Sequence, residues 1–296
     1  MRKKMTLRTR ILMNLANVAC IAFLILPLVP VILGAFQSER GLQADVHALL
    51  PVEYTLDNFR LILSGGADKG TLFQDISYLP NSVTWFPNAF LNSVIVGALV
   101  TVGVLVLASL TAFTVTRLDV RWTGWLMQIN MVSRMVPLIV LMVPLFVVLR
   151  GFGLLNTLSG VIITEIGLLL PYAIIILVPY FQQLPKELEE SARLDGCTRF
   201  MAFMRILLPL CKPALAASGV IMFIISWHEL LIPLIIVSKP EVMTVPVVLA
   251  GLVSDHFVFF TVMMAICLIG LLPTLALVLL LQKYLVKGLT AGAVKG

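Results

Sequence analysis

Residues 184–209 are Leu184-Pro-Lys-Glu-Leu-Glu-Glu-Ser-Ala-Arg-Leu-Asp-Gly-Cys-Thr-Arg-Phe-Met-Ala-Phe-Met-Arg-Ile-Leu-Leu-Pro209, a polar stretch between two long apolar blocks. The glutamates near its start favour the first turns of a helix, where the helix dipole stabilises negative charge. Gly196 is a typical helix stop, and Thr198 can cap a following helix, which Pro209 and Pro213 should end. The stretch therefore predicts a helix, a tight turn and a second helix.

The second predicted helix has an apolar stripe at helical spacing, formed by Phe200, Phe203, Met204 and Leu207. Such a stripe has two interpretations. It can rest on the protein's own membrane domain as an amphipathic loop, or it can be offered to a groove in a partner protein. The residues of the stretch alone leave both open.

On either side of this stretch the chain is strongly apolar. Of its 296 residues, 60% are hydrophobic and 12% are charged, a composition that a soluble domain could not bury. An apolar block of about 20 residues is long enough to cross a bilayer as a helix. We therefore expect an all-α membrane protein with a single transmembrane domain over residues 1–296, a polar loop at 182–212, and six transmembrane helices near 11–36, 89–115, 124–149, 158–181, 213–236 and 258–282.

The net charge of +6 reports topology rather than nucleic-acid binding. If the N-terminus is cytoplasmic, fifteen of the 21 Lys and Arg residues fall on the cytoplasmic side, as the positive-inside rule requires. The basic start resembles a signal peptide, but its apolar run is too long and no small-x-small cleavage site follows. We expect an uncleaved first span, cytoplasmic termini and a cytoplasmic 182–212 loop.

A few charged side chains lie within the apolar blocks, namely Arg134, Glu165 and the His228-Glu229 pair. Charges in membrane helices are costly and usually face a bundle interior or a water-filled path. Arg134 and Glu229 could therefore line a translocation route, or they could be structural and pair with each other, with polar backbone or with a second subunit. Glu165 lies about two turns from the start of its block and is expected to snorkel toward water.

No sequence pattern indicates an enzyme. The chain has no phosphate-binding Gly-x-x-x-x-Gly-Lys-Ser/Thr loop and no catalytic Ser/His/acid arrangement, and its four cysteines have no metal-like spacing. The chain therefore has no recognisable means of hydrolysing ATP by itself. One function that these residues allow is that of a self-sufficient ion- or proton-coupled carrier, with Arg134, Glu165 and Glu229 as an ion or proton relay.

The polar stretch resembles the EAA motif of ABC importer permeases. Glu190-Ser191-Ala192, Asp195-Gly196 and Ile206-x-Leu208-Pro209 match that motif in type and spacing, although Ser191 and Cys197 replace its usual alanines. In that family the loop is a coupling helix that fits a cleft in a cytoplasmic ATPase. The resemblance implies these coupling residues: Glu190, Ser191, Ala192, Asp195, Gly196, Phe200, Phe203, Ile206 and Pro209.

Other stretches are similar to the maltose-type, MalG-like carbohydrate permeases: Tyr54-Thr-Leu-Asp-Asn-Phe59, Phe90-Leu-Asn-Ser93, Arg134-Met-Val-Pro137 and Gly288-Leu-Thr-Ala-Gly-Ala-Val-Lys-Gly296. Trp227-His228-Glu229 resembles a Trp-Asn-Glu/Asp pattern of those permeases. His228 departs from it, and a neutral hydrogen-bonding role is expected there. The resemblance implies the type I ABC importer permease fold in a bacterial inner membrane.

The same resemblance implies the partners: a second related permease, two copies of an ABC ATPase and an external sugar-binding protein. ATP is used by the partner subunits, and no cofactor or metal is expected on this chain. The substrate implied is an oligosaccharide, a glycoside or a sugar-like polyol. Residues implied in further contacts are Gly292, Lys295 and Gly296 toward the ATPase interface, Arg134, His228 and Glu229 on the translocation path, and Ser254, Asp255 and His256 toward the binding protein.

Overall fold

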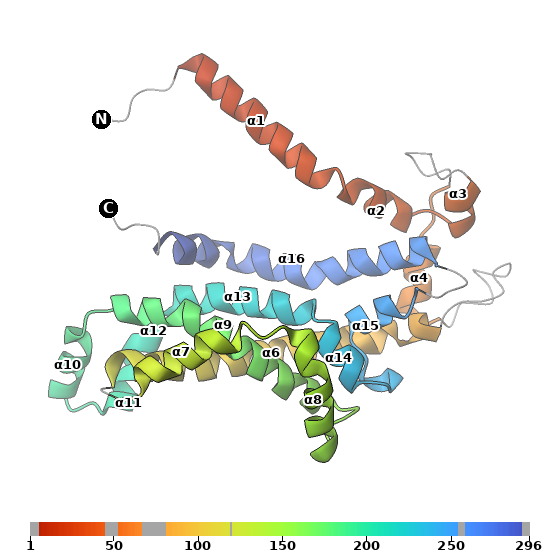
Figure 1. Cartoon of the computed structure of the whole chain (residues 1–296). Coiled ribbons are helices and arrows are strands. Elements are labelled where there is room, and N and C mark those ends of the chain that lie inside the picture. The colour runs from red at the N-terminus through yellow and green to blue at the C-terminus, as the bar shows by residue number, and fades with distance from the viewer. Residues whose placement is uncertain (1–5, 45–52, 67–80, 119, 254–257, 292–296) are drawn as a thin grey trace. The chain divides into compact units, whose positions relative to one another are not determined.

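The computed structural model describes residues 6–44, 53–66, 81–118, 120–253 and 258–291 (Figure 1). Within these ranges the regular structure is helical, and the only bridges of β type are two isolated ones, Gln37 with Tyr54 and Val253 with Val258. The prediction of an all-α protein is confirmed.

The described helices include between four and six candidate membrane spans, depending on how two bent pairs are counted. The four long apolar helices are α1 (Leu7–Ile25), α6 (Phe86–Arg117), α9 (Leu158–Gln183) and α16 (Phe260–Ala291). One bent pair is α7 (Thr123–Ser133) with α8 (Leu138–Gly151), and the other joins Arg199–Leu210 to α13 (Lys212–Trp227).

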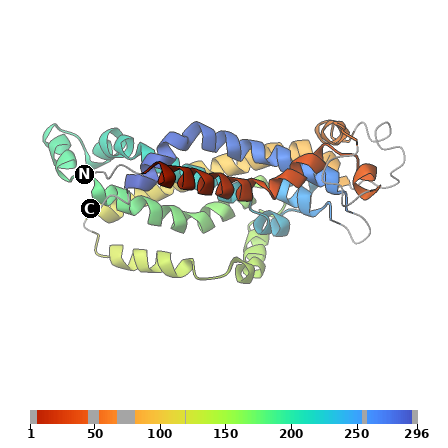
Figure 2. The same cartoon turned by 90° about the horizontal axis from the view of Figure 1, so that it is seen from above.

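The bend between α7 and α8 lies in the apolar block at 124–149. The two helices meet at 103° (Figure 2). Pro137 stands at the N-cap of α8 in an extended conformation, with φ −61° and ψ 133°. A proline removes a helical N–H and disfavours helix in the residue before it, so the helix breaks at this point.

The chain divides into two compact units, which are described one at a time: Met1–Pro87 with Leu249–Leu271, and Asn88–Val248 with Leu272–Gly296. The first contains α2 (Leu28–Ala35), α3 (Glu39–Ala44), α4 (Asp57–Leu63) and η1 (Asn81–Trp85).

Buried polar side chains fasten the short helices of the first unit. The Asn58 amide donates to the carbonyls of Ala35 at 3.0 Å and Gln37 at 2.8 Å. The buried Glu39 carboxylate accepts from the backbone N–H of Thr261 at 3.0 Å and from its hydroxyl at 2.8 Å. Buried polar groups need such partners, so these residues specify the packing of this unit.

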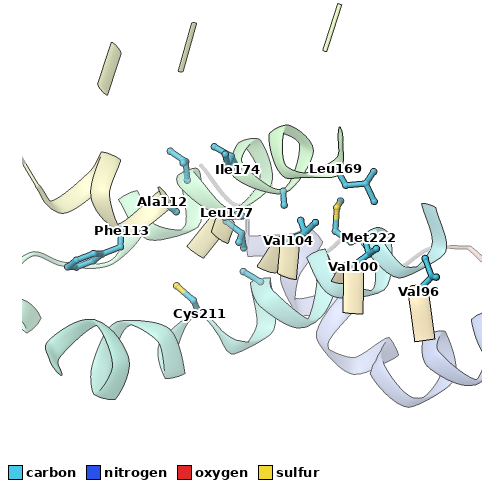
Figure 3. Packing of buried hydrophobic residues seen from close by; sticks show 14 of the residues in the cluster. Val96, Val100, Val104, Ala112, Phe113, Leu169, Ile174, Leu177, Cys211 and Met222 are labelled. Carbon is cyan, nitrogen blue, oxygen red and sulfur yellow. The ribbon is translucent and has the colours of Figure 1, made fainter. Parts of the chain in front are cut away.

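The second unit has the larger apolar core, and its centre lies on α6, α9 and α13 (Figure 3). Small buried side chains recur every four residues along one face of α6: Val96, Val100, Val104, Ala108 and Ala112. Leu169, Ile174 and Leu177 of α9 and Met222 of α13 belong to the same cluster. Small side chains let membrane helices approach one another closely, so this face of α6 can pack tightly in the core that it shares with α9 and α13.

Side-chain hydrogen bonds also tie the start of α6 to a loop region that is distant in the sequence. The Asn92 amide donates to the carbonyls of Glu241 and Met243, each at 2.9 Å, and the Ser93 hydroxyl accepts from the Val245 N–H at 2.8 Å. These contacts join the start of α6 to η3 (Pro240–Val242) and α15 (Val245–Ala250). Asn92 and Ser93 therefore fix a loop that is distant in sequence.

Candidate functional site

The polar stretch begins with α10 (Glu187–Leu194), which ends at Gly196 as the sequence predicts. Gly196 has φ +89°, a left-handed conformation that glycine adopts without strain. The Cys197 N–H donates to the Ala192 carbonyl at 2.9 Å, and the Gly196 N–H donates to the Arg193 carbonyl at 3.1 Å. This pair of bonds is a Schellman motif, and it fixes the angle at which the chain leaves the helix.

The second helix begins as predicted, but it is not α-helical throughout. The Thr198 hydroxyl accepts from the Met201 N–H at 3.2 Å and caps α11 (Arg199–Ala202). Next come a π-helical turn, η2 (Phe203–Leu207), and α12 (Leu208–Leu210). Pro209 itself lies inside α12, and the helical segment ends at Leu210, between the two prolines that were expected to end it. The wider π-turn before Pro209 relieves the clash of a proline ring with the preceding turn, and the chain bends by 75° only after Leu210.

One face of this segment is anchored in the core of the second unit. Ala192, Ala202, Phe203 and Leu207 are buried. The Phe203 ring lies 4.9 Å from the Phe113 ring of α6 and 6.2 Å from the Phe181 ring of α9, centroid to centroid. The structure therefore places Ala192 and Phe203, both predicted coupling residues, on the anchoring side, where they hold the segment rather than meet a partner.

The opposite face is exposed. Glu190, Ser191, Asp195, Gly196 and Pro209 lie on the surface, and Ile206 is half-buried. Phe200 is 60% exposed and Leu194 is 90% exposed; Met201 and Met204 lie on the same surface. We call Leu194, Phe200, Met201 and Met204 the outer apolar surface. Exposed aromatic and aliphatic side chains between charged residues are typical of a protein interface.

The two interpretations of the apolar stripe therefore each describe one face. Phe203 and Leu207 are buried against the membrane domain, whereas Phe200 and Met204 are exposed. Leu194 was not recognised in the sequence because it falls in a polar, helix-ending context. Only its 90% exposure identifies it.

Arg117 at the end of α6 is a further residue that the sequence did not single out. Its Nη2 donates to the carbonyls of Phe181 at 2.9 Å and Leu184 at 2.6 Å. These carbonyls lie at the C-terminal end of α9, where the helix dipole attracts positive charge, and the Phe181 carbonyl also accepts from the Leu184 N–H at 3.4 Å. Arg117 therefore holds the point at which the polar stretch leaves the membrane helix.

A pocket of about 370 Å³ lies elsewhere in the second unit and gathers the charged residues of the apolar blocks. Its walls come from the α7–α8 bend, α9, the end of α13 and the start of α14 (Leu231–Ile236). Six of its lining residues carry polar side chains: Ser133, Arg134, Glu165, Tyr172, Ser226 and Glu229.

Each charged group of this pocket has its own setting. The Arg134 guanidinium lies 4.1 Å above the centroid of the Tyr172 ring. One Glu229 oxygen accepts from the N–H groups of Leu231 at 2.9 Å and Ile232 at 3.2 Å, and so caps α14. No ion pair joins Arg134 to Glu229, so these two do not pair with each other; Glu229 is instead bonded to polar backbone, another of the structural roles expected for it.

Glu165 does not snorkel. It is 1% exposed and accepts a hydrogen bond from the Ser226 hydroxyl of α13 through one oxygen. The sequence expectation failed because depth from a helix end says nothing about which face of the helix a residue occupies. His228 lies apart: it is exposed, follows α13 as its C-cap, and its Nδ1 is 2.8 Å from the Ile224 carbonyl.

The remaining predicted contacts cannot be placed. Ser254, Asp255, His256, Gly292, Lys295 and Gly296 lie outside the described residues. In the part of the chain that the structure covers, no three His, Cys, Asp or Glu side chains are grouped as a metal site would need.

Residues 104–291 match the family described as "Binding-protein-dependent transport system inner membrane component". The trehalose transport system permease protein of Mycobacterium tuberculosis is 33% identical over 250 residues, which are 84% of this chain and 85% of that protein. The trehalose/maltose transport system permease protein of Thermococcus litoralis is 34% identical, with 77% and 82% covered. The sulfoquinovosyl glycerol transport system permease protein of Agrobacterium fabrum is 32% identical, with 72% and 81% covered.

A solved structure shares the fold. One chain of a bacterial ABC transporter involved in the import of the acidic polysaccharide alginate aligns with a TM-score of 0.75. The alignment covers 95% of this chain and 99% of that chain at 19% identity. The fold expected from the sequence, that of an ABC importer permease, is confirmed.

Proposed function

Because the chain belongs to the family of binding-protein-dependent transport system inner membrane components, we propose that it is one permease subunit of an ATP-driven carbohydrate importer. It is a multi-pass membrane transport subunit rather than an enzyme. The relatives named for trehalose, maltose and arabinooligosaccharides support a sugar substrate. The substrate class that we propose is an oligosaccharide or glycoside.

The observation that carries this function is the two-faced segment from α10 to α12. Its inner face is fixed to α6 and α9 through Phe203, and its outer apolar surface is free. A segment built in this way can transmit motion, because a partner that holds Phe200 and Leu194 also moves the helices that hold Phe203. The proposed partner is a cytoplasmic ABC ATPase, present in two copies. Its closure on ATP would move the segment as a lever.

Charged residues around the outer apolar surface would orient the docking. Glu190 is exposed and could form a charge-assisted contact with an Arg or Lys of the ATPase. Ser191, Asp195, Ile206 and Pro209 complete the proposed contact region. We also propose that the C-terminal residues Gly292, Lys295 and Gly296 reach the ATPase interface, and that both termini are cytoplasmic.

The other partners complete the translocation path. A second related permease would supply its other half, and Arg134, His228 and Glu229 are the proposed path residues of this chain. An external sugar-binding protein would deliver the solute to the loop that contains Ser254, Asp255 and His256. ATP would be bound only by the partner subunits, so this chain needs no cofactor of its own.

Purification of the tagged chain in mild detergent, followed by mass spectrometry, tests this assembly. We expect an ATPase with a phosphate-binding loop and a second permease at stoichiometric amounts. Uptake of radiolabelled trehalose, maltose and arabinotriose by cells with and without the chain's gene tests the substrate class. A stable homo-oligomer alone, with uptake stopped at once by a protonophore, would overturn the proposal in favour of a self-sufficient carrier.

A further inference from the structure

The pocket that contains Arg134 and Glu165 has the size and the lining of a ligand site. Its volume of about 370 Å³ lies in the range of small-molecule sites, which run from about 300 to 1,000 Å³. Its lining is mainly apolar, with Leu138, Leu141 and Ile232 among the walls, and the polar groups are few. This composition, apolar walls with a few placed polar groups, is typical of ligand sites.

One polar atom in this pocket has no partner. The second oxygen of Glu165, Oε1, is buried and accepts no hydrogen bond, although Oε2 is held by Ser226. A buried carboxylate oxygen without a partner is costly, and native structures usually satisfy such groups with a ligand or water. Because Glu165 lines the pocket, a hydroxyl donor within the pocket could satisfy it.

The same pocket also offers hydrogen-bond donors and an aromatic ring. The Arg134 guanidinium lies on the Tyr172 ring, and no described hydrogen bond or ion pair occupies its N–H groups. Arginine has five N–H donors in a planar fork, so several can reach a ligand while the stack is kept. Acceptor, donors and an aromatic ring therefore surround one cavity.

The balance of charge selects the class of ligand. A cation would be repelled by Arg134, and an anion would be repelled by Glu229, both of which line the same cavity. A neutral ligand that both donates and accepts hydrogen bonds meets neither repulsion. Sugars and polyols have this property, since each hydroxyl can do both.

We propose that this pocket is a subsite for one hydroxyl-rich ring of the transported solute, with Glu165 accepting from a ring hydroxyl and Arg134 donating to another. Ser226 is a positioning residue, because its hydroxyl holds the Glu165 carboxyl in the orientation that leaves Oε1 free. The inference rests on the proposed function and adds to it a sugar contact within this subunit.

The test is a cycle of substrate and protein changes in the importer reconstituted into proteoliposomes with its binding protein. The substrate is the radiolabelled disaccharide of the panel that the wild-type importer transports, together with its monodeoxy analogues. We expect the wild type to transport at least one analogue about tenfold more slowly than the parent sugar, the effect of one lost hydrogen bond to a charged group. In Glu165→Gln the discrimination, which is the ratio of the transport rate of the parent sugar to that of this analogue, should fall toward one.

The cycle separates the subsite from other effects. Discrimination by the binding protein is the same for both variants and cancels, and a general loss of folding slows parent and analogue equally. Glu39→Gln is the matched control, because Glu39 is also buried but belongs to the first unit. It should alter yield without changing discrimination.

Arg134→Lys provides a second variant if Glu165→Gln fails to assemble, since it keeps the charge but loses the planar fork. It should reduce discrimination against an analogue that lacks a different hydroxyl. Uptake with unchanged discrimination in every assembled variant would overturn the subsite while leaving the proposed function intact. Failure of the wild type to transport any sugar of the panel would overturn both.

Discussion

Replacement by alanine should have different effects at the two phenylalanines 200 and 203: a loss of stability at Phe203 and a loss of ATPase binding at Phe200. Phe203 is 2% exposed and its ring contacts those of Phe113, Phe181 and Phe200. Truncation of a fully buried phenylalanine costs about 3–5 kcal/mol, which combines lost burial and the cavity that remains. Phe203→Ala should therefore lower the stability of the permease by this amount and loosen α11 to α12 from the core.

Phe200 is the matched control, three residues earlier in the same segment. It is 60% exposed, so Phe200→Ala should change the free energy of unfolding by no more than about 0.5 kcal/mol. Its ring belongs to the outer apolar surface, where an aromatic anchor can contribute on the order of 2 kcal/mol to binding. We therefore expect about thirtyfold weaker ATPase binding with an unchanged fold.

The assay has two parts. Unfolding in detergent with added sodium dodecyl sulfate, followed by circular dichroism, gives the stability of each variant. Binding of the purified ATPase to the immobilised permease gives the affinity. Equal destabilisation by the two substitutions, or a neutral Phe203→Ala, would refute the assignment of an anchoring and an exposed face.

Three further predictions concern the same region. Gly196→Val forces a β-branched residue to φ +89° and should lower the ratio of sugar uptake to ATP hydrolysis, with an unchanged amount of permease in the membrane. Gly124→Val in α7, where an added side chain also meets open space, should leave this ratio unchanged. The same ratio in both variants would contradict the prediction. Arg117→Met removes the donors to two carbonyls at the end of α9 and should destabilise the permease by about 2 kcal/mol, as measured by unfolding in detergent; wild-type stability would contradict it. Maleimide should modify Cys197 in the native protein and Cys211, which is 3% exposed, only after denaturation, as mass spectrometry of the peptides would show; early labelling of Cys211 would contradict its burial.

Local signals in the sequence were sufficient for the parts of the fold that depend on neighbouring residues. The stop at Gly196 and the cap at Thr198 follow from backbone conformation and one side-chain hydrogen bond, and the structure has both. The apolar blocks predict membrane helices because their length and composition are also properties of consecutive residues. Length and composition do not show where such a block bends, and Pro137 turns one of them through 103°.

The parts that depend on distant residues could not be predicted. Phe200 and Phe203 look alike in the sequence, and only the rings of Phe113 and Phe181 show which one faces the core. Glu165 was expected to snorkel because it is close to the start of its apolar block, and its buried partner, Ser226, is 61 positions away in the sequence. Tyr172 was missed because an aromatic residue in an apolar helix is unremarkable until an arginine lies over it.

Because of the π-turn at Phe203–Leu207, the number of residues in the polar stretch also determines the direction in which the next helix begins. In an α-helix each residue advances the direction of the side chains by about 100°. A π-turn contains one extra residue within a turn, so it offsets the azimuth of everything that follows it. The nine residues between Gly196 and Ile206 therefore set an angle as well as a length. Loss or gain of one residue there would leave the composition almost unchanged but would aim the entry into α13 in a different direction.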